Sequence, residues 1–157
     1  LPLSAYEDLS AFKIYLADVG VLRRLSKLDP VAFREGNRLF TEFKGALTEN
    51  FILQSLVPQF DAIPHYWSRI NPPYEVDFII QRKNDIIPVE VKADMNIKSR
   101  SLKKYAETFE QETKLRVRFS MNNLRMDEGV LNIPLFMADQ ADRLIGMALG
   151  EGDSLMS

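Results

Sequence analysis

The chain has 157 residues, of which 46% are hydrophobic and 27% charged, which is the size and composition of one globular domain with a substantial core. The formal net charge of −2 and the pI near 5.5 exclude the overall basic character of many nucleic-acid-binding domains, so any affinity for nucleic acid must come from a local patch. The chain has no cysteine, which excludes disulfides and thiolate chemistry. Because it has no apolar run of about 18 residues and no signal-peptide pattern, we expect a cytoplasmic protein without a membrane partner.

Residues 1–30 are typical of a connecting arm that packs on a preceding domain. The chain begins without methionine and in mid-phrase, so we expect it to be a fragment of a longer protein. Within the arm, alternation at 13–16 predicts a short strand, and Asp18 is expected to cap a short helix. We predict a globular domain over 31–149 and a disordered tail over 150–157.

A helix is predicted from about Leu39 to Leu56, because apolar side chains recur every three or four residues and cover a broad arc. Glu49 falls on the apolar face of this helix, where an unpaired carboxylate would be costly. Two explanations remain open. Either Arg69 or a backbone amide satisfies the carboxylate, or Glu49 serves as an outer metal ligand or water-positioning group beside Asp77.

Residues 60–69 predict the first strand of a sheet. His65 is the single histidine, and in an aromatic strand it is more typical of a packing residue than of a general base. Trp67 is likewise expected in the core rather than as a platform for a nucleic-acid base. Arg69 lies near the strand end, from which its guanidinium could reach a carboxylate or a nucleic-acid phosphate.

Residues 74–94 predict two strands joined by a polar turn, since apolar and polar side chains alternate on both arms. One face of this hairpin is expected to be apolar and to comprise Val76, Phe78, Ile80, Ile87, Val89 and Val91. Asp77 is expected on the opposite face, together with Glu90 and Lys92. Side chains two positions apart on a strand lie roughly 6–7 Å apart on one side, so we expect these three ionisable groups to form one site.

Two carboxylates on neighbouring strands and one lysine are a suitable set for metal-dependent phosphodiester hydrolysis. Asp77 and Glu90 can hold a hard divalent cation through oxygen. Lys92 can orient or deprotonate a water, or neutralise the charge that grows on the phosphate. The plainer alternative is an exposed polar strand face with a surface ion pair.

The spacing of these residues resembles that of a known superfamily. Asp77 is followed by twelve residues and then by Glu90-Val91-Lys92, which is similar to the signature of the PD-(D/E)XK nucleases. More closely, about residues 10–120 resemble the C-terminal domain of many prokaryotic AAA-type ATPases. The matching phrases are KIYLADVGVLRRL (13–25), GALTENFIL (45–53), HYWSR (65–69), EVDFII (75–80) and IIPVEVKAD (86–94). One position departs from the superfamily pattern, since Val76 stands where a proline often precedes the aspartate.

The resemblance implies a fold, a site and partners. The expected fold is an α/β, restriction-endonuclease-like sandwich, in which helices flank a central mixed sheet with the core order αβββαβ. The implied catalytic residues are Glu49, Asp77, Glu90 and Lys92, and the implied ligands of a Mg²⁺ or Mn²⁺ ion are Asp77, Glu90 and the backbone of Val91. The implied partner is an AAA-type ATPase domain that precedes this one in the same protein. The chain has no Walker-type phosphate loop, so that ATPase would lie outside it.

Basic residues gather after residue 94, where Ser101 is expected to cap a helix that runs to about Glu112. The basic start of this helix could meet a nucleic-acid backbone. The residues expected to contact nucleic acid are Arg69, Lys98, Lys103 and Lys104. The alternative is a solvated helix face with i,i+4 ion pairs.

Alternation predicts further strands at 115–119 and 130–133, and a helix is expected near 139–149. The resulting order of helices and strands is compatible with an α/β sandwich around one sheet. Two functions from different classes remain. The first is a metal-dependent nuclease that cuts DNA or RNA. The second is an inactive module that binds nucleic acid or protein for the attached ATPase, since fold does not determine function.

Overall fold

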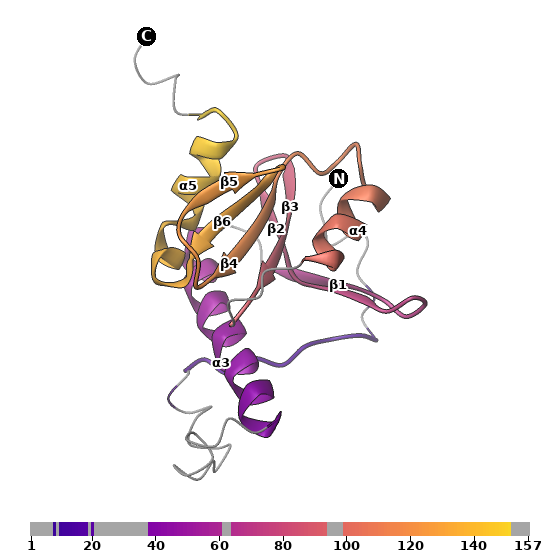
Figure 1. Ribbon diagram of the computed structural model, residues 1–157, viewed down its shortest axis with the longest axis vertical. Helices are drawn as coiled ribbons and strands as arrows, with labels where there is room; N and C mark the ends of the chain where they lie inside the picture. Colours follow the sequence, from indigo (N-terminus) through magenta and orange to yellow (C-terminus); the bar gives the residue numbers. More distant parts are fainter. Residues whose placement is uncertain are drawn as a thin grey trace.

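The protein is seen in a computed structural model that describes residues 8, 10–18, 20, 38–60, 64–93 and 99–151 (Figure 1). The predicted helix after Asp18, Lys98 and the tail beyond residue 151 lie outside these described residues. Among the described residues, no helix is long and apolar enough to cross a membrane.

Six strands form one mixed sheet in the order β1-β2-β3-β4-β6-β5. The strands are β1 (His65–Arg69), β2 (Tyr74–Arg82), β3 (Asp85–Val91), β4 (Arg116–Ser120), β5 (Arg125–Asp127) and β6 (Val130–Pro134). The helices are α3 (Arg38–Leu56), η2 (Val57–Gln59), α4 (Arg100–Thr108), η3 (Leu135–Gln140) and α5 (Ala141–Ala148). The first three strands are antiparallel, β3, β4 and β6 are parallel, and β5 returns antiparallel to β6. The predicted α/β sandwich and its core order αβββαβ are confirmed.

Two hydrophobic clusters lie on the two faces of the sheet. The larger one joins α3, η3 and α5 to one face, with Phe78, Val89 and Phe119 at its centre. The smaller one lies under α4, whose buried Leu102 and Tyr105 pack against β2. Figure 1 shows α3 and α5 on one side of the sheet and α4 on the other. Each helix therefore covers the sheet with one apolar stripe, as two-layer packing requires.

Trp67 belongs to the smaller cluster, as expected for a packing residue. Its indole makes edge-on contacts with two rings, at centroid distances of 5.4 Å to Tyr105 and 6.3 Å to Phe109. Tyr105 and Phe109 are themselves 4.7 Å apart. Such tilted and edge-on ring pairs add to the stability gained from burial alone, so this aromatic group ties β1 to α4.

β2 contains a bulge at the position of the candidate aspartate. His65 pairs with Ile79 and Trp67 with Val76, so Asp77 and Phe78 together lie opposite a single residue of β1. Val76 consequently packs in the α4-side cluster, whereas Phe78 packs in the α3-side cluster. The prediction that Val76 shares the face of Phe78 and Ile80 was wrong, because one extra residue in a strand reverses the direction of every side chain before it.

Residues 10–18, the main described part of the N-terminal arm, contact α3 and form no strand, contrary to the prediction for 13–16. The amide of Leu16 donates to Asn50 Oδ1 at 2.9 Å, and Asn50 Nδ2 donates back to the Leu16 carbonyl at 3.0 Å. Gln54 Nε2 lies 3.3 Å from the same carbonyl. Asn50 is 1% exposed, so a buried side chain makes the bonds that a neighbouring strand would otherwise make.

Helix α5 is attached to β2 by charge as well as by packing. Arg82 Nε lies 2.6 Å from Asp142, and Arg82 Nη1 lies 2.8 Å from Glu151. Gly146 of α5 makes room for this guanidinium, because a β-carbon at that position would lie 2.8 Å from Arg82 Nη2. The Arg82 side chain is 11% exposed, so these are partly buried, charge-assisted contacts.

Candidate active site

Asp77 lies where β2 and β3 stop pairing. The backbone ladder between them runs from the turn to the pair Phe78–Val89, and beyond it Asp77 Oδ2 accepts a hydrogen bond from the Val91 amide at 2.7 Å. Burial, followed by the nearby Glu49 carboxylate, raises the pKa of Asp77 to about 7, although the Val91 amide acts in the opposite direction. The ionised form of Asp77 is therefore unfavourable in the folded protein, and a bound cation would stabilise it.

Glu90 and Lys92 lie together on the α4 side of β3. Glu90 is 4% exposed, and its Oε1 lies 3.0 Å from Lys92 Nζ. Its Oε2 accepts a hydrogen bond from the Ser99 hydroxyl at the start of α4. Ser99 occupies the N-cap position without capping the helix through its side chain, since its hydroxyl is directed to Glu90. The start of α4 is thus bonded to the Glu90 carboxylate.

Glu49 approaches from the α3 side and is met by the N-terminal arm. Burial raises the pKa of Glu49, whereas Lys13, the Tyr15 hydroxyl and Lys92 act to lower it. Tyr15 packs its ring 5.7 Å from that of Phe78, so the arm contacts β2 as well as α3. Arg69, the side chain expected as a possible partner of Glu49, donates from its Nε to the Asn71 carbonyl at 3.0 Å in the β1–β2 turn.

Asp77 therefore lies between two groups of charged residues. Glu49 belongs to the α3 side, the pair of Glu90 and Lys92 belongs to the α4 side, and both carboxylates act to raise the pKa of Asp77. Lys92 in turn lowers the pKa of Glu49, so each of the four predicted catalytic residues interacts by charge with at least two of the others. We expected Asp77 to share the face of Glu90 and Lys92. The bulge instead places Asp77 between the two faces of the sheet.

The oxygen atoms of this region suit a hard divalent cation in their chemistry. Asp77 and Glu90 are carboxylates on adjoining strands, and the Val91 carbonyl could complete the protein's share of ligands. Burial of two neighbouring carboxylates without a cation is costly, as the raised pKa of Asp77 indicates. Among the residues that the structure describes, no three or more Asp, Glu, His or Cys side chains are grouped so that they could hold a metal ion. Asp77 and Glu90 are therefore the side chains left to hold an ion, and most of its ligands would have to be water or substrate oxygens.

The basic residues predicted to contact nucleic acid are dispersed. Arg69 lies near the tip of the β1–β2 hairpin, which extends away from the rest of the sheet (Figure 1). Lys104 pairs with Glu107 at 3.3 Å on the surface of α4, as in the solvated-face alternative. Lys103 is exposed on the same helix and lines a groove beside β4. These positions alone do not form one surface.

Sequence reasoning missed four residues around the site. Lys13 pairs with Glu75, lies over the Tyr66 ring at 5.2 Å and lowers the pKa values of Asp77 and Glu49. The others are Tyr15, Ser99 and Arg118, of which Arg118 is the direct neighbour of Glu90 in the register of β3 and β4. The arm residues are far from the hairpin in sequence, and no short-range pattern connects them to it. Arg118 could have been found, because it alternates with apolar residues in a predicted strand.

The fold is an α/β domain, and near the open end of its β2–β3 hairpin a lysine and three carboxylates influence one another's charge. Residues 44–137 match the family model described as a domain of unknown function, DUF4143, and the chain belongs to this family. The match includes Glu49, Asp77, Glu90 and Lys92, but neither the N-terminal arm nor α5. No curated protein and no solved structure matches the chain.

Proposed function

We propose that this chain is a metal-dependent nuclease domain of the PD-(D/E)XK type, which hydrolyses phosphodiester bonds in DNA or RNA. The observation that carries the proposal is the buried Glu90–Lys92 pair, at 3.0 Å, beside the electrostatically strained Asp77 on the adjoining strand. A surface ion pair would not need a carboxylate that is 4% exposed. We also propose that the domain acts in the cytoplasm, as the C-terminal part of a prokaryotic AAA-type ATPase.

Each residue has a distinct role in this mechanism. Asp77, Glu90 and the Val91 carbonyl would hold a Mg²⁺ or Mn²⁺ ion, which when bound polarises a phosphate oxygen and makes water more acidic. Lys92 would then exchange its contact with Glu90 for one with the attacking water or the scissile phosphate. Glu49 would orient the water from the α3 side. Ser99 holds Glu90 in place through its second oxygen, which leaves Oε1 directed at Lys92.

The test is a cleavage assay on supercoiled plasmid and on labelled single-stranded DNA and RNA, with Mg²⁺, Mn²⁺ or EDTA. We expect cleavage with metal only, and a loss of about 100-fold or more in Lys92→Ala, as for the removal of a general acid or base. Lys83→Ala is the matched control, because Lys83 is exposed in the β2–β3 turn and pairs with Glu151 instead. Equal activity in Lys92→Ala and the control would contradict the proposed role.

The second candidate is an inactive module that binds nucleic acid or protein for the ATPase. One observation favours it, namely that no three metal-binding side chains are grouped among the described residues. In that case the wild-type domain would never cleave, with any divalent metal and with or without its ATPase. Its melting temperature would also be the same with and without Mg²⁺ or Mn²⁺, because an empty scaffold gains nothing from the ion.

A further inference from the structure

The sheet face that carries Glu90 is only partly covered. Helix α4 packs its buried residues against β2, whereas beside it, over β4, β6 and β5, lies a groove of about 660 Å³. Ser99 lines one end of this groove and donates its hydroxyl hydrogen to Glu90. The groove therefore begins at the candidate site and leads away from it across the sheet.

Four residues from four adjacent strands form a straight row along this face. Glu90 is the register partner of Arg118, Arg118 of Asn132, and Asn132 of Arg125. Strands are spaced by roughly 4.8 Å, so the row extends over about 14 Å from Glu90 to Arg125. The last three residues of the row line the groove. A carboxylate of the candidate site is thus followed by two guanidinium groups separated by an amide.

The side chains that line the groove carry an excess of positive charge. The charged ones are four cations, Lys103, Arg116, Arg118 and Arg125, and two anions, Asp127 and Glu128. Part of this charge is satisfied internally, since Arg125 pairs with Asp127 at 2.8 Å on an exposed edge. Exposed ion pairs of this kind contribute little to stability, so another anion can replace Asp127 beside Arg125 at small cost. The net charge of the chain is −2, so the cationic groove is a local departure from it.

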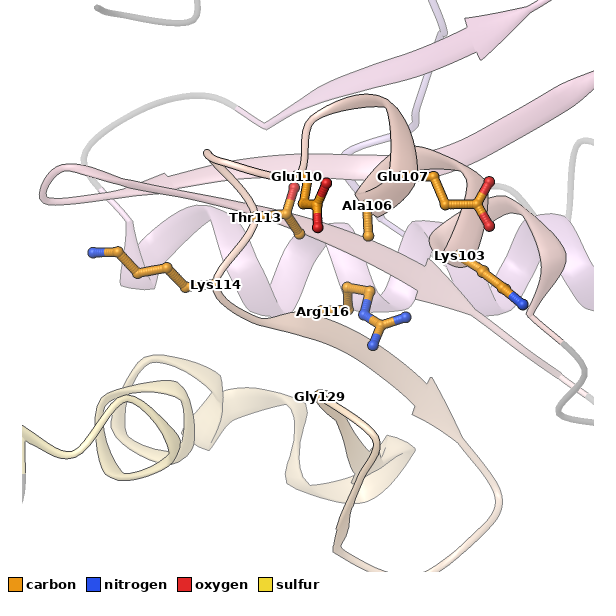
Figure 2. A pocket seen from close by; sticks show the side chains of 8 residues that line it. All are labelled: Lys103, Ala106, Glu107, Glu110, Thr113, Lys114, Arg116 and Gly129. Carbon is orange, nitrogen blue, oxygen red and sulfur yellow. The ribbon is translucent and has the colours of Figure 1, made fainter.

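A neighbouring hollow of about 370 Å³ on the other side of Arg116 carries a smaller positive excess (Figure 2). Figure 2 shows Arg116 between α4 and the turn at Gly129. Glu107 and Glu110 lie on the side of Arg116 that is opposite to Gly129. Lys114 points away from this hollow and pairs with Asp85 at 2.6 Å. Three cations and two glutamates line the hollow, and the glutamates and the pairing of Lys114 make it less favourable to an anion than the groove.

Arg118 has Glu90 and Asp127 as charged neighbours, but one of its N–H groups has no acceptor among the described residues. Its Nε is buried, and within the described part of the chain it has no hydrogen-bond partner. A buried guanidinium N–H without an acceptor is costly, and native proteins rarely leave one so. Guanidinium groups bind phosphate with two parallel hydrogen bonds. Because Arg118 lines the groove, an anionic oxygen bound there would meet a guanidinium group whose hydrogen bonds the described residues do not complete.

We propose that this groove binds the phosphodiester backbone of a single nucleic-acid strand on its way to the candidate site. Arg118 and Arg125 suit an extended polyanion better than one isolated phosphate, because they lie two strand spacings apart along the groove. Asn132 lies between them, and its amide is already bonded to Ser120, Asn122 and Asn123. Leu124 lines the same groove and is 44% exposed, which offers an apolar contact to a base. The inference rests on the proposed function for the direction of the strand, but binding is measurable without cleavage.

The experiment measures fluorescence anisotropy of a labelled single-stranded DNA of mixed sequence, in EDTA, at several salt concentrations. Lys103→Gln with Arg125→Gln removes two exposed charges of the groove, and Lys83→Gln with Arg143→Gln removes two exposed charges elsewhere. We expect weaker binding only for the groove pair. The slope of log affinity against log salt should fall by about 1.4, at about 0.7 for each lost contact with single-stranded nucleic acid.

Arg118→Lys provides a second variant, which keeps the charge beside Glu90 but removes the planar group. It should weaken binding while leaving the melting temperature near that of the wild type. Equal weakening by both double variants would overturn the proposal, as would no measurable binding by the wild type. Polyglutamate that competes as well as unlabelled DNA would also overturn it, because the groove would then be a general polyanion site.

The outcomes of the two proposals can be told apart. Cleavage that persists with normal affinity in the groove variants would refute the groove and leave the nuclease proposal standing. Binding that depends on the groove, in a wild-type domain that never cleaves, would refute the nuclease and leave the groove standing.

Discussion

Replacement of Asp77 by asparagine should stabilise the metal-free domain at neutral and alkaline pH. Burial and Glu49 raise the pKa of Asp77 from 3.8 to about 7. Over that interval the folded state holds a proton that the unfolded chain has lost, so stability falls as the pH rises from about 4 to about 7 and is then constant. Across this interval the free energy of unfolding falls by about 4 kcal/mol, at about 1.36 kcal/mol for each pH unit.

The Asp77→Asn variant avoids this loss because an amide does not ionise. Its oxygen can still accept the hydrogen bond from the Val91 amide. We therefore expect the variant to exceed the wild type by about 4 kcal/mol at pH 8 and by about 2 kcal/mol at pH 5. The measurement is urea-induced unfolding at both pH values, in EDTA. At pH 8 the gain corresponds to a rise of about 8–16 °C in melting temperature.

Asp139→Asn is the matched control, because Asp139 is exposed in η3. Such a surface change should alter the free energy of unfolding by less than about 0.5 kcal/mol at either pH. The reasoning fails if Asp77→Asn destabilises the domain at pH 8. It also fails if the gain is the same at pH 5 and pH 8, because the effect would then not arise from ionisation.

Three further predictions concern the ion, the arm and the core. Millimolar Mg²⁺ or Mn²⁺ should raise the melting temperature of the wild type, and the free energy of unfolding should gain about 2.7 kcal/mol at about 100 times the dissociation constant. Glu90→Gln should abolish this shift in melting temperature, and an equal shift in both proteins would argue against the site. Asn50→Leu should lower the free energy of unfolding by about 2 kcal/mol, since it removes both hydrogen bonds to Leu16; urea unfolding checks this, and an unchanged value would mean that the arm is not held by them. Phe119→Ala, at a position that is 0% exposed, should cost about 3–5 kcal/mol by the same measurement, and a cost under about 1 kcal/mol would contradict the assignment of the core.

The longest and most periodic segments could be predicted from the sequence. Helix α3, expected at about 39–56, is found at Arg38–Leu56, and both arms of the hairpin are strands. The short β5 was not predicted, because three exposed residues next to a turn carry no hydrophobic pattern. The segment at 13–16 alternates like a strand, yet its backbone bonds to Asn50, and alternation alone does not reveal which partner a backbone will find.

The ends and faces of elements were harder to predict for physical reasons. Val76 and Phe78 are both apolar, so a bulge that sends them to opposite faces leaves no trace in the pattern. Helix α4 begins after Ser99 rather than at the predicted Ser101, and it ends at Thr108 rather than near Glu112. Either serine suits an N-cap, and the choice between them depends on the position of Glu90, which lies on another element.

The site was predictable as a set of residue types but not as an arrangement. Spacing in the hairpin identified Asp77, Glu90 and Lys92, and the apolar surroundings of Glu49 identified it as unusual. Their mutual positions remain a matter of tertiary structure, since Asp77 is directed by a bulge and Glu49 by contacts with the arm. Whether these residues bind metal stays a prediction.

The attachment of α5 to β2 means that the smallest stable unit is longer than the stretch shared with the family. A chain cut after residue 137 would lose Ala141 and Ile145 from the larger core. It would also leave the Arg82 guanidinium, which is 11% exposed, without Asp142 and Glu151. The loss of these anions would leave the Arg82 charge uncompensated, which destabilises a domain. Fragments chosen for expression should therefore extend at least to Glu151.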